Sequence, residues 1–479
     1  MTTTELNPVT GKRKQEFLLH FEKLAPYHTK YRKRYRYFWN DIADYFNYFI
    51  HEEDRVLEIG CATGEMLARL KGKQKAGIDY APGMIAIAQE QHPKIDFYLS
   101  DIEKLELNET FDVIVIPHTC GYFVDILAAF KAIHKLCHPR TKIIINYYNF
   151  LWEPALGFGE KIGVKKPSPK QNWLTNHDMR TFLMLAGFET YRHTMRVLWP
   201  VYIPLLSRLV NKYIARLPLI NQLCLNQYCF ARPAISKETD DYSVSIVIPA
   251  RNESGNLHNA LERMPKFGTA MEIIFIEGNS TDDTWERVQE LPAKYPDWNI
   301  KIGQQDGKGK GDAVRKGFGM ATGDILMILD ADLTVAPEDL PSFYHAIASG
   351  KGEFINGARL VYPMEKNAMR FLNLLGNKFF SILFSWLLEQ PVRDTLCGTK
   401  VIFRTDYEKL IKNRHFFGNF DPFGDFDLIF GAFKLNLKIV DLPVRYHERV
   451  YGDTNISRFS HGFLLLRMAA YAARKIKFW

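Results

Sequence analysis

The stretch Asp324-Ile-Leu-Met-Ile-Leu-Asp-Ala-Asp332 decides the fold of the C-terminal half of this chain. Its apolar run is typical of a buried strand, and Asp330 and Asp332 follow at the point where that strand must reach the surface. Two carboxylates one residue apart at the mouth of a parallel sheet can hold a divalent ion, and the ion can hold a diphosphate. We therefore expect Asp330 and Asp332 to bind Mg²⁺ or Mn²⁺, and we expect turnover to depend on Asp332.

Two more buried strands precede this stretch, and each of them leads into polar residues. The first, Val244-Ser-Ile-Val-Ile248, breaks at a proline into a polar turn, and the second, Glu272-Ile-Ile-Phe-Ile276, is followed by a glutamate. Ligands bind at the carboxyl ends of strands in open α/β sheets, so the residues after these two strands are candidates for ligand binding. They are Pro249, Ala250, Arg251, Glu253 and Glu277.

A basic, glycine-rich loop, Gly307-Lys-Gly-Lys-Gly311, enters a helix between these strands and the paired aspartates. It lacks the residue order of an ATP-binding phosphate loop, which disfavours an ATPase. Lys308 and Lys310, together with Arg315 further along, are placed to approach a diphosphate. A divalent ion would stabilise the charge of that leaving group as a glycosidic bond breaks.

These segments, in this order, resemble an inverting family 2 glycosyltransferase with the nucleotide-sugar-dependent fold known as GT-A, over about residues 243–460. The resemblance implies that the five residues listed after the first two strands bind the donor nucleotide. It also implies that Asp330 and Asp332 bind the metal and the donor diphosphate. One departure is Gly278, where many relatives carry a second acid, so the identity of the nucleobase in the donor stays open.

The last part of the chain most resembles polyprenyl-phosphate glycosyltransferases of the dolichol-phosphate mannose synthase type. The likeness lies in residues 393–400, in residues 423–427 and in the motif Arg449-Val-Tyr-Gly452. It implies that Arg449 acts in catalysis by clamping the acceptor phosphate, which an arginine can hold with two hydrogen bonds. A lysine that follows this motif in those enzymes is Asn455 here, so one acceptor contact is unaccounted for.

The acceptor decides whether the reaction needs a catalytic base. A polyprenyl phosphate is already anionic near neutral pH, whereas a hydroxyl acceptor needs a carboxylate to take its proton. Asp425 or Asp427 could be that base, or could organise the acceptor loop. We expect transfer of a hexose from a nucleotide diphosphate to a polyprenyl phosphate with inversion, and the alternative is a glycan or another hydroxyl acceptor.

The N-terminal half is organised around a second glycine turn. A strand over residues 55–59 runs into Gly60-Cys-Ala-Thr-Gly64 and then into a helix, and glycines in such a turn let the backbone approach a ligand. Later strands end near an acid suited to two ribose hydroxyls and near a second acid where an adenine amino group could lie. The third glycine of the dinucleotide pattern is missing, which disfavours NAD. The residues at successive strand ends are Glu58, Gly60, Gly64, Asp79 and Asp101.

About residues 30–234 resemble a class I S-adenosylmethionine-dependent methyltransferase, which has a Rossmann-like fold. The resemblance implies that Gly60 and Gly64 pack near the methionine part of the cofactor. It further implies that Asp79 binds the ribose and that Asp101 lies beside the adenine. No methyl acceptor and no base are identified, although His118 lies where a substrate would arrive. The alternative is that this half is a non-catalytic module.

Length and composition fit a globular protein of two α/β domains. The chain has 479 residues, of which 47% are hydrophobic and 24% charged, and its net charge is +8. We expect domains at residues 1–234 and 243–479, joined by a polar linker at 235–242. Basic clusters such as residues 30–36 are explained as solvated faces, with contact to anionic lipid or to nucleic acid as the alternatives, and no nucleic-acid-binding module accompanies them.

No segment is a clean apolar run of about 20 residues, so a membrane-spanning helix is not expected. Residues 369–388 and 463–479 are apolar but interrupted by polar residues, and they are either amphipathic helices on a bilayer surface or core helices. The six cysteines lack metal-ligand spacing, and the N-terminus lacks the profile of a signal peptide. We therefore expect a cytoplasmic enzyme that is peripherally attached to a membrane.

Overall fold

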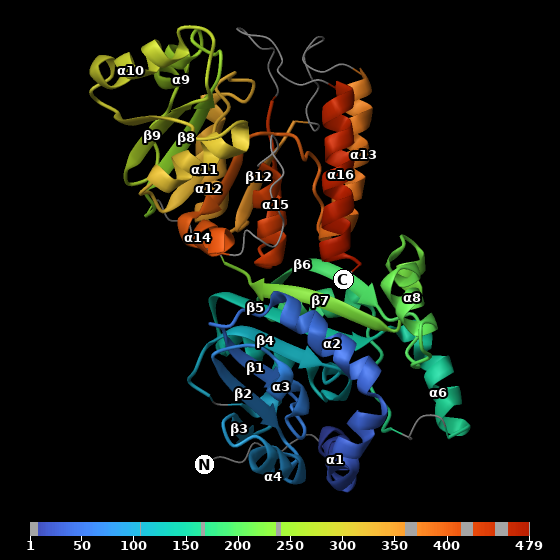
Figure 1. Cartoon of the computed structure of the whole chain (residues 1–479). Coiled ribbons are helices and arrows are strands. Elements are labelled where there is room, and N and C mark those ends of the chain that lie inside the picture. Colours follow the sequence, from blue (N-terminus) through green and yellow to red (C-terminus); the bar gives the residue numbers. More distant parts are fainter. Residues whose placement is uncertain are drawn as a thin grey trace. The chain divides into compact units, whose positions relative to one another are not determined.

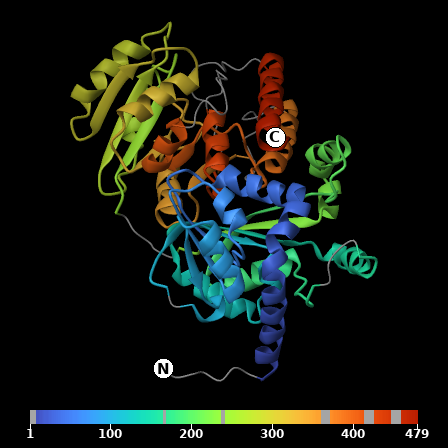
Figure 2. The same ribbon diagram turned by 60° about the horizontal axis from the view of Figure 1, so that its bottom comes forward.

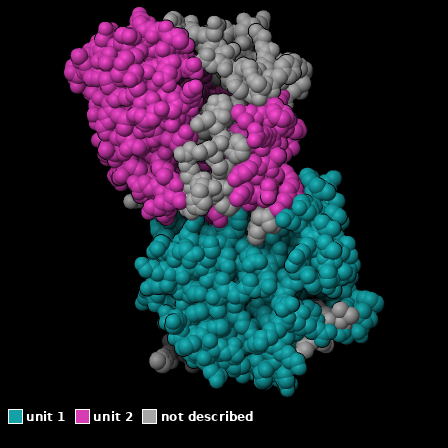
Figure 3. Space-filling view, in the orientation of Figure 1, with its two compact units in different colours: residues 1–234 teal, residues 235–479 magenta. Residues whose placement is uncertain are grey.

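A computed structural model describes residues 8–105, 107–163, 168–235, 241–359, 371–412, 425–445 and 458–478. The chain divides into two compact units, unit 1 with residues 1–234 and unit 2 with residues 235–479 (Figure 3). Each unit is built on its own seven-stranded α/β sheet. The expected fold class, two α/β domains in succession, is thus confirmed.

The sheet of unit 1 has the strand order β3-β2-β1-β4-β5-β7-β6 (Figure 1). Neighbouring strands are parallel from β3 to β5, whereas β7 runs antiparallel to both β5 and β6. Chain order reverses direction between β1 and β4, and such a switch point opens a crevice at the carboxyl ends of the strands. The strands are β1 (Arg55–Ile59), β2 (Gln74–Asp79), β3 (Asp96–Leu99), β4 (Phe111–Pro117), β5 (Cys137–Tyr148), β6 (Phe188–Arg196) and β7 (Asn226–Pro233).

Two long helices at the N-terminus precede the sheet of unit 1. The second of them buries Phe38, Ile42, Phe46 and Phe49, whose spacing of three or four residues places them on one face. The helices of the unit are α1 (Pro8–Arg34), α2 (Arg36–Phe49), α3 (Glu65–Arg69), α4 (Pro82–Gln91), α5 (Ile126–Lys135), α6 (Glu153–Lys161), α7 (Asn176–Leu185) and α8 (Leu206–Lys212). Short 3-10 helices lie at residues 102–104, 120–122, 150–152, 214–216 and 220–223.

The sheet of unit 2 has the order β10-β9-β8-β11-β13-β12-β14. The first four strands in that order are parallel, β13 runs antiparallel to both of its neighbours, and β12 pairs with β14 in parallel. Chain order again reverses at the centre, here between β8 and β11. The strands are β8 (Val244–Ala250), β9 (Met271–Glu277), β10 (Asn299–Gln304), β11 (Ile325–Ile328), β12 (Phe354–Ala358), β13 (Lys400–Phe403) and β14 (Ile439–Pro443).

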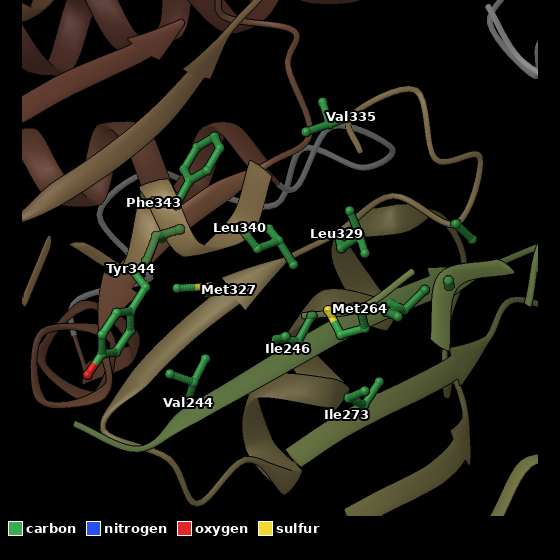
Figure 4. Close-up of a cluster of buried hydrophobic side chains, with 14 of the residues drawn as sticks. Val244, Ile246, Met264, Ile273, Met327, Leu329, Val335, Leu340, Phe343 and Tyr344 are labelled. Carbon is green, nitrogen blue, oxygen red and sulfur yellow. The ribbon is translucent and has the colours of Figure 1, made fainter. Parts of the chain in front are cut away.

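The core of unit 2 shows why the central strands are so apolar. Val244, Ile246 and Met327 point from β8 and β11 toward Leu340 and Phe343 at helix α12 (Leu340–Ala348; Figure 4). These side chains are almost completely shielded from solvent. Their burial supplies the hydrophobic free energy that fixes both strands and therefore fixes the polar residues at their ends.

Helices α13 (Phe371–Leu388) and α16 (Arg458–Ile476) lie side by side in both views of the chain (Figures 1 and 2). The Phe384 ring of α13 also stacks on Phe430 of α15, with ring centroids 5.4 Å apart. The remaining helices of unit 2 cover or flank the sheet. The helices are α9 (Leu257–Glu262), α10 (Thr284–Lys294), α11 (Lys310–Met320), α12 (Leu340–Ala348), α13 (Phe371–Leu388), α14 (Arg404–Lys412), α15 (Asp425–Lys434) and α16 (Arg458–Ile476).

The two apolar helices expected either on a bilayer or in the core are each partly buried and partly exposed. One face of each is buried, whereas Phe379 and Ile382 on α13 and Phe463 and Leu466 on α16 are exposed. Among the described residues, no helix has the length and apolar character needed to cross a bilayer.

Candidate active sites

In unit 2 the carboxyl ends of four parallel strands meet at one edge of the sheet. Strand β8 ends at Ala250, which pairs in register with Glu277 at the end of β9. Strand β11 lies on the other side of β8 and ends just before Asp330. The switch point therefore brings together three segments that are about 25 to 50 residues apart in sequence, as the pattern of buried strands predicts.

The paired aspartates differ in their surroundings. An oxygen of Asp330 lies 2.5 Å from the ammonium nitrogen of Lys310, which is the first residue of α11. The Oδ1 atom of Asp332 accepts hydrogen bonds from the backbone N–H of Thr334 at 3.1 Å and from its hydroxyl at 2.8 Å. The first carboxylate thus already faces a cation, while a turn of the backbone orients the second.

Gly398 is a part of this site that the sequence reasoning missed. A β-carbon at this position would collide with the Asp330 carboxylate and with the ammonium group of Lys310. The segment between α13 and β13 therefore comes so close to the paired aspartates that only glycine leaves them in place. The signal in the sequence was the run of residues 393–400, in which Gly398 had no assigned role.

A buried ion pair holds the segment that carries Gly398. The carboxylate of Asp394 accepts hydrogen bonds from the Arg359 guanidinium at 2.7 and 2.9 Å and from the Asn377 amide at 3.1 Å. Burial acts to raise the pKa of Asp394, but the charge and hydrogen bonds of Arg359 outweigh it and keep the pKa below its usual value. Removing one partner of such a buried pair would leave an unpaired charge and destabilise the fold, so the pair fixes the path of the backbone in this segment.

Asp330 and Asp332 offer the carboxylate oxygens that a divalent cation prefers as ligands. In the described ranges, no three His, Cys, Asp or Glu side chains are clustered closely enough to enclose a metal ion on their own. Two carboxylates would leave most positions around a hard cation to the oxygens of a diphosphate and to water. The ammonium group beside Asp330 marks this carboxylate as one that faces positive charge.

The predicted nucleotide residues differ in how much they face solution. Glu277 is buried, and its carboxylate accepts the Ser280 N–H at 2.5 Å and the Gln304 amide at 3.2 Å. Glu253 is also buried and accepts a hydrogen bond from the Asn256 amide at 2.7 Å. Both glutamates therefore help to shape the turns after β8 and β9.

The other donor candidates lie on or next to the same edge. Ala250 is buried in β8, and its carbonyl accepts the Gly278 N–H at 2.8 Å. Pro249 precedes it in the strand, and Arg251 and Lys308 are exposed. Of the donor candidates, these two exposed side chains can therefore rotate toward a ligand without movement of the backbone.

The acceptor residues are only partly described. Asp427 is largely buried in α15, and one of its oxygens lies 4.0 Å from a guanidinium nitrogen of Arg315. Asp425 is the first residue of α15, but its side chain lies outside the described residues, as do Arg449 and Asn455. Their predicted roles stay predictions.

In unit 1 a cavity of about 220 Å³ lies at the carboxyl ends of β1, β2 and β4. Gly60, Asp79 and Asp101 line it, whereas Glu58 and Gly64 are not among the lining residues. Gly60 and Gly64 have φ angles of +75° and +76°, a conformation that favours glycine. The glycine turn is thus required by the backbone, and only its first glycine faces the cavity.

The two aspartates of the cavity are fixed by backbone groups. The Asp79 carboxylate accepts N–H groups of Ala62 at 2.9 Å and of Ala81 at 3.0 Å, while burial raises its pKa. Asp101 accepts the Glu103 N–H at 3.1 Å and is ion-paired with Lys14. Lys14 belongs to α1, so the N-terminal helix reaches the place where an adenine is expected.

Helix α1 is the largest part of this site that the sequence reasoning missed. Its Phe21, Leu24, His28 and Tyr31 line the cavity at a spacing of three or four residues. Arg32 also lines it, with the guanidinium carbon 3.6 Å from the centre of the Trp39 ring. The explanation of residues 30–36 as a solvated face was therefore wrong for Arg32. The aromatic residues at helical spacing were the available signal.

A buried acid, Glu58, lies behind the cavity wall and faces the charge of the half-buried Arg32, which lines the cavity. Glu58 is fully buried, and neither of its carboxylate oxygens has a close hydrogen-bond partner among the described residues. Burial raises the pKa of Glu58 to about 8, although the charge of Arg32 opposes the shift. Burial likewise lowers the pKa of Arg32, with Glu58 opposing that change. The charge of each group therefore opposes the pKa shift that burial causes in the other.

Residues 31–193 match the model of a methyltransferase domain, and residues 245–414 match family 2 of the glycosyl transferases. The chain joins a methyltransferase domain to a family 2 glycosyltransferase domain. Each match falls on one of the two units and includes the predicted site residues up to Asp101 in the first and up to Asp332 in the second.

Curated relatives named as glycosyltransferases match part of the chain. The chain is 39% identical over 120 residues to a dolichol-phosphate mannosyltransferase of Pyrococcus furiosus, a match that covers 25% of this chain and 33% of that protein. It is 26% identical over 225 residues to a dolichyl-phosphate beta-glucosyltransferase of Dictyostelium discoideum, covering 44% of this chain and 68% of that protein. The chain therefore spans about a third of the length of the first of these relatives.

Solved structures resemble either domain at low identity. A SAM-dependent methyltransferase of Thermotoga maritima, described as a possible histamine N-methyltransferase, is 16% identical, with 45% of this chain and 99% of that chain covered and a TM-score of 0.36. Glucosyl-3-phosphoglycerate synthase of Mycobacterium tuberculosis, in complex with Mn²⁺ and UDP, is 18% identical, with 49% and 80% covered and a TM-score of 0.36. TM-scores of this size support no inference about chemistry.

His118 of the methyltransferase domain lies in the wall of the cavity against aromatic rings. Its ring centroid is 4.0 Å from that of Tyr148 and 5.5 Å from that of Phe38. Burial, with the positive charge of Arg32, lowers the pKa of His118 to about 3. The imidazole is therefore neutral at pH 7, and it lies among aromatic rings in the wall of the cavity.

The buried Glu58 makes the stability of the methyltransferase domain pH-dependent. Its folded pKa of about 8 lies above the unfolded value of 4.5, so the folded state binds the extra proton and loses stability as pH rises toward 8. Between pH 6.5 and 8 the loss should reach about 1.4 kcal/mol per pH unit at most. Glu58→Gln should flatten the decline in melting temperature over this window, whereas Glu90→Gln, at an exposed position, should not.

The lower limit of this pH window is set by two histidines, because burial lowers the pKa of His28 and of His118 to about 3. Below pH 6.5 they gain protons only in the unfolded state, so acidification destabilises the domain with the opposite sign. An identical alkaline decline in the wild-type protein and in Glu58→Gln would contradict the assignment.

Proposed function

We propose that the glycosyltransferase domain transfers a hexose from a nucleotide diphosphate sugar to a polyprenyl phosphate, with inversion and with the help of a divalent metal. We further propose that the methyltransferase domain transfers a methyl group from S-adenosylmethionine to an acceptor still to be identified. The observation that carries the first proposal is the pair Asp330 and Asp332 beside Lys310, at the switch point of the sheet.

In the proposed donor complex, Asp330 and Asp332 hold the metal, and Lys310, Lys308 and Arg251 approach the phosphates. A divalent cation at this position neutralises the charge that develops on the departing nucleotide diphosphate. Lys310 starts helix α11, so the positive end of the helix dipole adds to its charge. Pro249, Ala250 and the turns shaped by Glu253 and Glu277 would receive the nucleoside.

A phosphate acceptor suits the described part of the acceptor side. A phosphate oxygen that attacks the anomeric carbon carries no proton to remove, so no base is needed. One oxygen of Asp427 lies 4.0 Å from a guanidinium nitrogen of Arg315, so this carboxylate already faces a cation. The curated relatives named for dolichyl phosphate support the same class of acceptor.

In the methyltransferase domain, the proposed cofactor lies in the cavity under α1. Asp79, held by two backbone N–H groups, would accept hydrogen bonds from the ribose hydroxyls, with Asp101 beside the adenine. Arg32 is a cation inside the cavity wall and would balance the carboxylate of the methionine part. Gly60 would face the same part. Methyl transfer depends mainly on holding two reactants in line, so no acid or base has to be assigned.

The proposed activity is tested by supplying labelled nucleotide sugars, Mg²⁺ or Mn²⁺ and polyprenyl phosphate to the purified protein. We expect label to move into the organic phase on extraction, and we expect EDTA to stop the transfer. Label that appears only in an aqueous glycan would favour the hydroxyl-acceptor alternative. In that case Asp425→Asn should lower the rate severely while donor binding persists, because a hydroxyl acceptor needs a base.

The methyltransferase proposal is tested by calorimetry with S-adenosylmethionine. Binding by the wild-type protein with loss of affinity in Asp79→Ala would support a functional cofactor site. An absence of binding heat would favour the alternative in which this domain is a non-catalytic module.

A further inference from the structure

Residues 199–223 of the methyltransferase domain have an unusual surface. They connect β6 to β7 and contain α8, which stands at the rim of unit 1 in Figures 1 and 2. Large apolar side chains along this segment are exposed, including Trp199, Val201, Leu209 and Leu223. Contiguous exposed apolar surface on a globular domain marks a binding face.

Helix α8 buries its uncharged polar side chains and exposes apolar ones, which is the reverse of an ordinary surface helix. Its polar residues Ser207 and Asn211 are buried, while Leu206 and Leu209 are exposed. The Asn211 side chain bonds both the N–H and the carbonyl of Trp199, at 2.9 and 2.7 Å. The polar side chains thus tie the segment together from within, and the apolar ones are directed outward.

Two tight turns display the most exposed leucines. Leu205 has φ +64° and Leu219 has φ +70°, and each lies in a turn closed by a bond between the residues on either side, Leu206 N–H to Pro204 C=O and Ile220 N–H to Pro218 C=O. Turns of this kind are rare and strained for a bulky residue. Leu205 is 76% exposed and Leu219 77% exposed. A short repeat, Ile203-Pro-Leu-Leu206 and Leu217-Pro-Leu-Ile220, encodes both turns.

The charge of the segment points to the chemistry of its partner. Residues 190–237 contain no aspartate or glutamate, while the exposed Arg208 and the half-buried Lys212 lie among the apolar residues. The neighbouring α6 exposes Phe158, and Ile162 directly after it is exposed as well, but the helix carries two glutamates, so it is left out of the surface. Apolar tips whose charged neighbours in the sequence are all basic match the headgroups and acyl chains of an anionic bilayer.

We infer that residues 199–223 form an interfacial surface with which the methyltransferase domain docks on an anionic lipid bilayer. Leu205 and Leu219 enter the boundary between headgroups and acyl chains, and Arg208 contacts lipid phosphate. Tyr37 of α2 donates a hydrogen bond to the Ser207 carbonyl at 3.1 Å, and Trp39 of the same helix lines the cofactor cavity. The docking surface therefore packs directly on a helix of the methyl-transfer site.

The test uses the full chain and sedimentation with vesicles, without donor or S-adenosylmethionine, so its outcome is independent of both catalytic proposals. Vesicles are pure phosphatidylcholine or contain about 30% phosphatidylglycerol. Leu205→Asn with Leu219→Asn removes the apolar tips but keeps residues that tolerate positive φ. We expect this variant to lose about tenfold or more in partitioning onto the anionic vesicles, since two leucines no longer leave water.

A matched control removes exposed apolar side chains elsewhere in the same domain, through Met184→Gln with Leu185→Gln on α7. It should bind vesicles as the wild-type protein does. Arg208→Glu should weaken binding to anionic vesicles alone. Equal binding of the Leu205→Asn, Leu219→Asn variant and the wild-type protein would overturn the proposal and indicate that protein covers this surface.

A second measurement does not use the Leu205→Asn, Leu219→Asn variant, so it does not depend on how well that variant folds. Brominated lipids quench tryptophan fluorescence on contact, so they should quench a component of the wild-type emission that is missing in Trp199→Phe. Equal quenching in both proteins would likewise overturn the proposal.

Discussion

Replacing Asp332 with asparagine is expected to lower the rate of glycosyl transfer about a thousandfold or more. The change removes half of the paired negative charge that holds the metal, and so removes the charge that stabilises the leaving diphosphate. The fold should survive, because an asparagine oxygen can still accept the Thr334 N–H and hydroxyl that now bond Asp332. The measurement is the initial rate with labelled donor and polyprenyl phosphate at saturating metal.

The matched control for this variant is Asp297→Asn. Asp297 is exposed in the turn between α10 and β10, at the opposite end of the strands from the proposed site. It should transfer sugar at the wild-type rate. Full activity of Asp332→Asn would contradict the assignment of the metal. The rate is compared at equal concentrations of folded protein, so that a loss of folded protein is not counted as a loss of catalysis.

The second large effect is expected from Gly398→Ala, the addition of one methyl group. A β-carbon there would overlap the Asp330 carboxylate and the Lys310 ammonium group, so both must move away from the proposed metal. Since the groups that must give way are ends of flexible side chains, we expect at most about 1–2 kcal/mol of lost stability. The rate should fall about a hundredfold or more, because an error of about 1 Å in placing reacting groups is already costly.

Gly319→Ala separates this effect from a general effect of glycine replacement. Gly319 is exposed near the end of α11, and a β-carbon there meets nothing within 4 Å. The substitution should stabilise the helix by about 0.5–1 kcal/mol and leave the rate unchanged. If Gly398→Ala retained the wild-type rate and metal dependence, the close approach of residues 393–400 to the donor site would be wrong.

The parts of the fold that could be predicted from the sequence are those governed by local patterns. Continuous apolar runs predicted β8, β9 and β11, because strands buried on both faces must be apolar throughout. The residues at their ends could then be grouped at one sheet edge, since parallel strands share that edge. The same reasoning placed Asp79 and Asp101 at the cavity of the methyltransferase domain.

The parts that could not be predicted depend on contacts between distant segments. Nothing local reveals that Gly398 packs on Asp330, because that contact follows from the antiparallel pairing of β13 with β11 and from the buried pair of Arg359 and Asp394. Arg32 lay in a basic run that resembled a solvated face, and only the packing of α1 over the cavity enclosed it. The polar interior of α8 was hidden in the same way by its contact with Tyr37.

The most direct measurement of the central claim is a crystal of the full chain grown with Mn²⁺ and a nucleoside diphosphate chosen from a thermal-shift screen. An anomalous difference peak within coordination distance of Asp330 and Asp332, bridging them to the diphosphate oxygens, is the predicted result. A bound diphosphate with no manganese peak beside these aspartates, or a peak at another group of residues, would contradict it.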